Sequence, residues 1–135
     1  MCLYNSKVAV ENFIKKCKIR NKKYVWMYKN FDCKNNVLIG MHRTNYKYKP
    51  GWNKSNSKRT SPYYETRDIS LGIHVIDTFN YYSDFVSIKV KCYLKDLIGV
   101  SDDYGRYREL AFSKIWIPKK SYDKAVSEFK TKKMV

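Results

Sequence analysis

Residues 86 to 95 alternate strictly between apolar and polar side chains, and no other pattern in the chain constrains the fold as much. Val86, Ile88, Val90, Cys92 and Leu94 occupy one side, and Ser87, Lys89, Lys91, Tyr93 and Lys95 occupy the other. Because successive side chains of a β-strand point to opposite faces of a sheet, the alternation predicts a strand with one face in a core and one in water.

Other segments also predict strands, because they are short, apolar or alternating, and rich in aromatic and β-branched residues. They are residues 23–31, 37–44, 72–79 and 109–117. The polar turn at 32–36 predicts that the first two form a hairpin. In the last, Ala111, Ser113, Ile115 and Ile117 oppose Phe112, Lys114 and Trp116, and Pro118 ends the strand. Residues 96–100 either extend the strand that ends at Lys95 or form its neighbour.

Two helical patterns flank the strands. Asn5 or Ser6 can cap a helix that runs to about residue 20, with an apolar side formed by Ala9, Val10, Phe13, Ile14 and Cys17. Ser121 can cap a second helix, in which Tyr122, Ala125, Val126 and Phe129 share a side and residues 130–135 fray. The order predicts an α+β fold with a mainly antiparallel sheet, an N-terminal helix and a C-terminal helix. A length of 135 residues suits one domain spanning residues 1–135.

Positive charge is concentrated in the first half of the chain. Residues 1–64 hold fifteen Lys or Arg against Glu11 and Asp32, a net charge of +13, whereas residues 65–135 hold thirteen against ten acids, a net charge of +3. Such a basic region repels itself unless an anionic partner neutralises it, and nucleic acid, a nucleoprotein complex or an acidic host protein surface would each do so. A lysine-rich composition alone could also produce a basic, merely solvated surface.

Residues 45–64 predict a long loop that joins rings to cations. The segment carries five aromatic residues and five Lys or Arg, and no acid. Nucleic-acid binding needs cations for phosphates and flat rings for unstacked bases, so this composition favours a binding loop. Tyr46 and Tyr48 would point to one side of an extended backbone and Lys47 and Lys49 to the other. The alternative is that the tyrosines cover the edge of the core and the lysines face water.

The predicted nucleic-acid-binding surface combines this loop with the lysines of the first helix and its exit. Its residues are Lys15, Lys16, Lys18, Arg20, Lys22, Lys23, Arg43, Tyr46, Lys47, Tyr48, Lys49, Trp52, Lys54, Lys58 and Arg59. No RNP-type, GXXG or zinc-finger spacing accompanies them, so the sequence predicts phosphate contacts and stacking with little base-sequence preference.

The sequence predicts neither a cofactor nor a metal site. Cys2, Cys17, Cys33 and Cys92 are widely spaced without a CxxC pair, which in an intracellular protein is typical of free thiols. The start of the chain lacks a secretory pattern and no stretch approaches eighteen apolar residues, so we expect a cytoplasmic protein without a membrane partner.

One local resemblance suggests an enzyme instead. His42-Arg43-Thr44 at a strand end, the later GIHVID segment and Glu109 on a late strand follow an order similar to that of ADP-ribosyltransferases, although the expected serine-rich motif is absent. The resemblance implies NAD binding, with the acid contacting the ribose. The opposing interpretation is that His42 and His74 are ordinary half-buried histidines.

A wider resemblance covers most of the chain. The segments MCL, YVWMYKNF, YKYKPG, GIHVID, VSIKVKCYL and SKIWI, in this order, resemble small uncharacterised accessory proteins of bacterial viruses and bacteria. This resemblance implies an accessory protein, located in the host cytoplasm if viral, that interferes with a host nucleic-acid or defence process. It implies no catalytic residue, so an enzyme is the less favoured interpretation.

Overall fold

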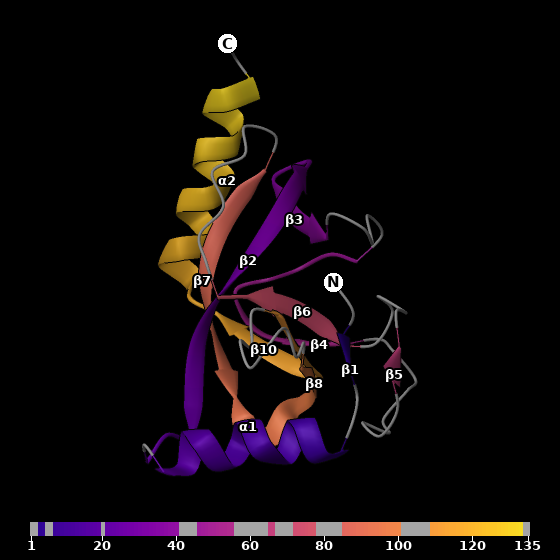
Figure 1. Ribbon diagram of the computed structural model, residues 1–135. Coiled ribbons are helices and arrows are strands. Elements are labelled where there is room, and N and C mark those ends of the chain that lie inside the picture. Colours follow the sequence, from indigo (N-terminus) through magenta and orange to yellow (C-terminus); the bar gives the residue numbers. More distant parts are fainter. Residues whose placement is uncertain are drawn as a thin grey trace.

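The described residues form two α-helices and an extensively paired antiparallel sheet (Figure 1). The computed structural model describes residues 3–4, 7–19, 21–40, 46–55, 65–66, 72–77, 85–100 and 109–133. The elements are β1 (Leu3–Tyr4), α1 (Lys7–Ile19), β2 (Tyr24–Lys34), β3 (Val37–Gly40), β4 (Gly51–Lys54), β5 (Glu65–Thr66), β6 (Ile73–Ile76), β7 (Val86–Tyr93), the 3-10 turn η1 (Leu94–Asp96), β8 (Leu97–Val100), β9 (Glu109–Phe112), β10 (Lys114–Ile117) and α2 (Lys119–Lys133). The predicted α+β class, with a helix near each end of the chain, is confirmed.

The sheet has the strand order β4-β10-β7-β2-β6-β9-β8-β1-β5, and β3 pairs with β2 off this path. Strand β2 is its longest member. It pairs with β7 from Tyr24↔Tyr93 to Phe31↔Val86, with β6 at Tyr28↔Ile76, and with β3 through its last residues. Every pairing between these strands is antiparallel, so half-buried alternating strands are the expected result.

A two-residue turn joins β2 to β3. Asn35 and Asn36 both have positive φ angles, 54° and 65°, which suit the tight hairpin turns whose twist matches that of the strands. Asparagine tolerates this left-handed backbone better than most side chains do. The hairpin is therefore confirmed, but β2 continues to Lys34 and the predicted turn at 32–36 was too long.

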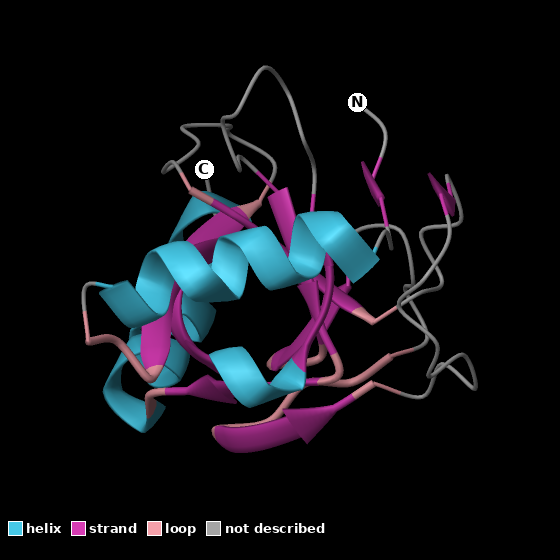
Figure 2. Cartoon of the chain, turned by 60° about the horizontal axis from the view of Figure 1, so that its bottom comes forward, coloured by secondary structure: helices cyan, strands magenta, loops and turns pink. Residues whose placement is uncertain are grey.

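The core is one cluster that draws on both helices and most strands. The predicted apolar sides of the helices are confirmed, because Val10, Phe13 and Cys17 of α1 and Ala125 and Phe129 of α2 are all buried in this cluster. Helix α2 lies along β7, and α1 lies against β8 at the other end of the molecule (Figures 1 and 2). Neither helix is long and apolar enough to cross a membrane.

The predicted strand at 109–117 is divided into two strands, β9 and β10, because the chain changes neighbours at Ser113. Before it, β9 pairs with β6 and β8, and after it, β10 pairs with β4 and β7. The Ser113 N–H donates to the Asp96 carbonyl at 2.8 Å, and the Ser113 carbonyl accepts from the Ser55 N–H at 2.8 Å. Ala111 and Phe112 are both fully buried, so the predicted alternation fails here.

Other boundaries also differ from the sequence-based prediction. Strand β7 ends at Tyr93, and β8 neither extends it nor pairs with it, since β8 pairs with β9 and β1. Part of the predicted loop at 45–64 is strand β4, and residues 56–64 lie outside the described residues. Helix α2 starts at Lys119 instead of Ser121 and remains helical to Lys133 rather than fraying from residue 130.

Tyr122 attaches α2 to the sheet through two hydrogen bonds. Its buried hydroxyl accepts from the Leu38 N–H at 3.0 Å and donates to the Tyr48 carbonyl at 2.7 Å. Tyr122→Phe leaves both backbone groups without this partner, so we expect the free energy of unfolding to fall by about 2 kcal/mol. Urea denaturation followed by circular dichroism measures the change. Tyr93→Phe, on a half-exposed ring, is the control and should change the value by less than about 0.5 kcal/mol; equal effects would contradict this role for Tyr122.

Candidate nucleic-acid interface

All three tryptophans of the chain lie in one row across four neighbouring strands. In register, Trp52 of β4 is opposite Trp116 of β10, Trp116 is opposite Lys91 of β7, and Lys91 is opposite Trp26 of β2. Residues opposite one another in an antiparallel ladder point to the same side of the sheet. The row Trp52–Trp116–Lys91–Trp26 therefore lies on one face.

Neighbouring positions extend this row into a surface, which we call the aromatic–lysine face. It comprises Tyr24 and Trp26 of β2, Lys89, Lys91 and Tyr93 of β7, Lys114 and Trp116 of β10, and Trp52 and Lys54 of β4. None of these side chains is acidic. The opposite side of the same strands faces the core, where Met27, Val90 and Ile115 are buried.

The rings of the aromatic–lysine face are unusually exposed. Tyr24, Trp26 and Trp52 keep 40%, 41% and 41% of their surface accessible, and they are the large hydrophobic side chains that stand out as exposed in the described part of the chain. An isolated exposed ring is common, but rings gathered on one face are a feature of interaction sites.

Lysine ammonium groups sit directly over these rings. The Nζ atom of Lys91 lies 4.1 Å from the ring centroid of Tyr24, 5.3 Å from that of Tyr93 and 5.9 Å from that of Trp26. The Nζ atom of Lys114 lies 4.8 Å from the ring centroid of Trp52. Cation–π attraction of this kind holds each ammonium at a fixed place beside a ring. An anion that approaches the face thus meets positioned charges.

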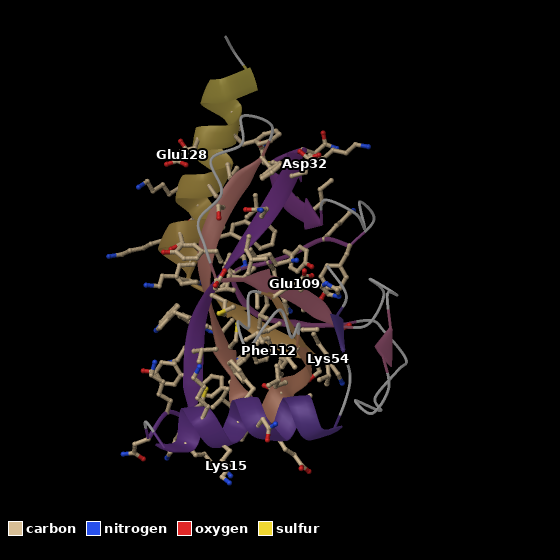
Figure 3. The ribbon with its side chains drawn as sticks, viewed as in Figure 1. Lys15, Asp32, Lys54, Glu109, Phe112 and Glu128 are labelled. Atoms are coloured by element: carbon tan, nitrogen blue, oxygen red, sulfur yellow. The ribbon has the colours of Figure 1, made fainter. Side chains whose placement is uncertain are left out.

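Strand β4 owes its orientation to Asn53. The Asn53 side chain is 2% exposed, accepts from the Lys49 N–H at 3.0 Å and donates to the carbonyls of Lys49 and Gly51 at 2.8 and 3.1 Å. Gly51 has a φ of 87°, a backbone conformation that favours glycine. Because Asn53 points inward, Trp52 and Lys54 point outward, and Figure 3 shows Lys54 at the side of the sheet.

The structure gathers only part of the predicted surface. Trp52 and Lys54 belong to the aromatic–lysine face, and the exposed Lys22 and Lys23 directly precede Tyr24 of β2. The exposed helix residues Lys15, Lys16 and Lys18 are elsewhere, and Lys15 points away from the sheet in Figure 3. Lys47 pairs with Ile39 of β3, beside the far end of β2, and Lys49 is exposed in the turn before β4. Arg20, Arg43, Lys58 and Arg59 lie outside the described residues.

The predicted role of Tyr48 as a binding ring is wrong, because Tyr48 is 7% exposed and belongs to the core. Its ring packs at 5.0 Å from that of Phe31 and at 4.5 Å from that of Tyr46. Tyr46 is half-buried, and its hydroxyl donates to the Lys54 carbonyl. The interpretation in which these tyrosines cover the edge of the core holds for both, while Lys47 and Lys49 remain exposed as expected.

Sequence reasoning missed most members of the aromatic–lysine face. The missed residues are Tyr24, Trp26, Lys89, Lys91, Tyr93, Lys114 and Trp116. The signal was present, since Lys89, Lys91 and Tyr93 occupy the water-facing side of the clearest alternating strand, and Tyr24 and Trp26 alternate on another. Aromatic residues on a water-facing side are the cue. Only the strand order shows that these sides are continuous.

A second cluster, of polar groups, joins β2, β6 and β9. The Nδ1 atom of His74 lies 2.6 Å from Oε1 of Glu109, and Nζ of Lys29 donates to the His74 carbonyl at 2.9 Å. Burial lowers the pKa of Lys29 from 10.5 to about 8. The hydrogen bond from His74 lowers the pKa of the Glu109 carboxyl. The cluster brings together His74 and Glu109, which both belong to the predicted NAD site, and residues 42–44 of that site lie outside the described residues.

The three cysteines in the described residues agree with the prediction that the cysteines form no disulfides. Cys17, Cys33 and Cys92 belong to no disulfide, and burial raises the pKa of Cys92 to about 12. A thiol that stays protonated is a poor nucleophile and a poor metal ligand. Within the described segments, no group of three His, Cys, Asp or Glu side chains is placed to hold a metal ion.

Comparison with known proteins assigns neither a family nor a function to this chain. No protein-family model, curated protein or solved structure matches this chain at a significant level.

Proposed function

We propose that this protein binds nucleic acid, alone or within a nucleoprotein complex, through the aromatic–lysine face. The observation that carries the proposal is the row Trp52–Trp116–Lys91–Trp26, which places every tryptophan of the chain beside a lysine on one exposed side of the sheet. Lysines neutralise phosphates and exposed rings stack on bases, and nucleic acid is the partner that uses both. An accessory role in a bacterial virus remains a prediction from the sequence resemblance.

Charge distribution supports nucleic acid over an uncharged ligand. The chain carries a formal net charge of +16, and the face contributes four lysines and no acid. On single strands each phosphate contact contributes about 0.7 to the slope of log affinity against log salt, and on duplex DNA about 0.9. Four contacts predict a slope of roughly −3 to −4.

The test replaces three lysines of the face together. In Lys54→Gln/Lys91→Gln/Lys114→Gln, we expect the salt slope to become shallower by about 2 to 3 and the affinity at 0.1 M salt to fall about a hundredfold. Fluorescence anisotropy of a labelled oligonucleotide of mixed sequence, titrated across a salt series, measures both. Thermal unfolding followed by circular dichroism checks that the variant is folded.

The matched control removes the same charge from α1. Lys15→Gln/Lys16→Gln/Lys18→Gln also lowers the net charge by three. This variant should therefore lose only the small part of the affinity that depends on the net charge of the whole protein. An equal loss in both variants would contradict the assignment to the face. Absence of oligonucleotide binding at low salt, together with a nuclease-resistant complex with an acidic host protein, would contradict the function itself.

A further inference from the structure

We infer that the aromatic–lysine face selects single-stranded nucleic acid, with unpaired bases stacked on Trp26 and Trp52. This inference rests on the proposed function and names the class of ligand for the same site. Its basis is that the rings are exposed, are arranged in a row and are separated by a positioned ammonium group.

The dimensions of the row suit a short single strand. From Trp52 to Trp26 the row crosses three strand spacings, which amounts to about 14 Å at roughly 4.8 Å per spacing. At about 3.4 Å per stacked nucleotide, this distance corresponds to about four nucleotides. Sheet proteins that bind single strands have sites of at least this size.

The rings pack against one another, yet Trp26 and Trp52 each keep 41% of their surface accessible to a base. The Trp52 and Tyr93 rings lie 5.5 Å apart and are inclined by 36°, and Tyr24 meets Trp26 edge-on at 90°. Lys91 is between these ring pairs, with its ammonium over Tyr24. A strand that stacks bases at both ends of the row would therefore bring its backbone past a fixed cation. Stacking tolerates any base, so little sequence preference follows.

A duplex cannot use this arrangement. Paired bases hide their faces within the stack, so the exposed tryptophans would contact only sugar and phosphate. The major groove is about 12 Å wide and admits a helix or a two-stranded ribbon, whereas this face spans four strands. Duplex binding would consequently depend on the lysines alone, and single-strand binding on lysines and rings together.

The experiment compares a single strand with a duplex for two protein variants. The probes are a labelled thymine oligonucleotide of about twelve nucleotides, which remains unpaired, and a duplex of the same length. In Trp26→Leu/Trp52→Leu, the affinity for the single strand should fall about thirtyfold or more, because two stacked bases are lost, while the salt slope is unchanged. Duplex affinity should change less than about threefold. Anisotropy measures affinity in each case.

A conservative variant separates stacking from folding. Trp26→Phe/Trp52→Phe keeps a ring at both positions and should retain single-strand binding within about fivefold. Intrinsic fluorescence gives a second readout in the unmodified protein: all three tryptophans lie on the face, so the single strand should quench it and the duplex should not.

The outcomes distinguish this inference from the function on which it rests. Equal or tighter duplex binding that is unaffected by Trp26→Leu/Trp52→Leu would overturn single-strand selection and leave nucleic-acid binding in place. Binding to neither probe at 50 mM salt would overturn both. Loss of single-strand binding in both the leucine and the phenylalanine variants, with unchanged thermal unfolding, would also overturn the stacking role.

Discussion

Replacing Phe112 with alanine is expected to lower the free energy of unfolding by about 3 to 5 kcal/mol, because the site combines a large ring with complete burial. Phe112 is 0% exposed and lies in register with Ile73 on one side and Leu97 on the other. Figure 3 shows it inside the molecule, between the sheet and α1. The surrounding strands are hydrogen-bonded on both sides, so they cannot close the cavity that the ring would leave.

Urea denaturation followed by circular dichroism measures this loss. Phe112→Leu retains most of the apolar volume and is the control, with an expected cost of about 1 kcal/mol. A loss below about 1 kcal/mol in Phe112→Ala would mean that the sheet around β9 is looser than its burial indicates.

Replacing Lys29 with methionine is expected to raise the free energy of unfolding at pH 7 by about 1 to 3 kcal/mol. Lys29 lies between Met27 and Phe31 on the inward side of β2, and its ammonium is 5.8 Å from the Phe31 ring centroid. Burial lowers its pKa from 10.5 to about 8, so the folded state disfavours the charged form. Methionine fills similar space without that charge, although the hydrogen bond to the His74 carbonyl is lost.

The same residue makes stability depend on pH. Between about pH 8 and 10.5 the folded protein has released the Lys29 proton and the unfolded chain still holds it, so this residue makes stability rise with pH in that window. The rise is on the order of 3 kcal/mol. Because the raised pKa of Cys92 makes stability fall above about pH 9 in both proteins, the contribution of Lys29 is read as a difference. Denaturation at pH 7, 8, 9 and 10 should show the stability of the wild-type protein rising relative to that of Lys29→Met.

The control makes the same lysine-to-methionine change at an exposed position of β2. Lys34→Met replaces an exposed lysine at the end of β2 and should change stability by less than about 0.5 kcal/mol while keeping the pH dependence. Destabilisation of Lys29→Met at pH 7, or the same rise with pH in both variants, would contradict the assignment to Lys29.

Local periodicity was enough to predict both helices and strands β2, β3, β6 and β7. The apolar side of α1 and the alternation in β7 are repeated over many residues, and each is buried as its spacing indicated. The errors fall where tertiary contacts override the local pattern. At Ser113 the alternation looks continuous in the sequence, but the chain leaves one set of neighbours and joins another, and this depends on residues far away.

The candidate site shows the same limit more strongly. Trp52 and Lys54 could be predicted because a basic, aromatic segment contains them, whereas Trp26, Lys91 and Trp116 come from three other strands. No local pattern reveals that β4, β10, β7 and β2 are neighbours in that order. The prediction that Tyr48 binds a base was wrong for a related reason. Alternation predicted on which side of the backbone Tyr48 lies, but it did not show that the core lies on that side.

The ladder between β2 and β7 has a consequence for how quickly the chain can fold. Tyr24 pairs with Tyr93 and Phe31 with Val86, so partners are 69 and 55 positions apart in the sequence. Closing loops of that size costs entropy before the ladder repays it, and proteins rich in such distant contacts fold in milliseconds to seconds. The β2–β3 hairpin needs no residue beyond Gly40, whereas the tryptophan row cannot assemble until β10, at Lys114–Ile117, has been synthesised.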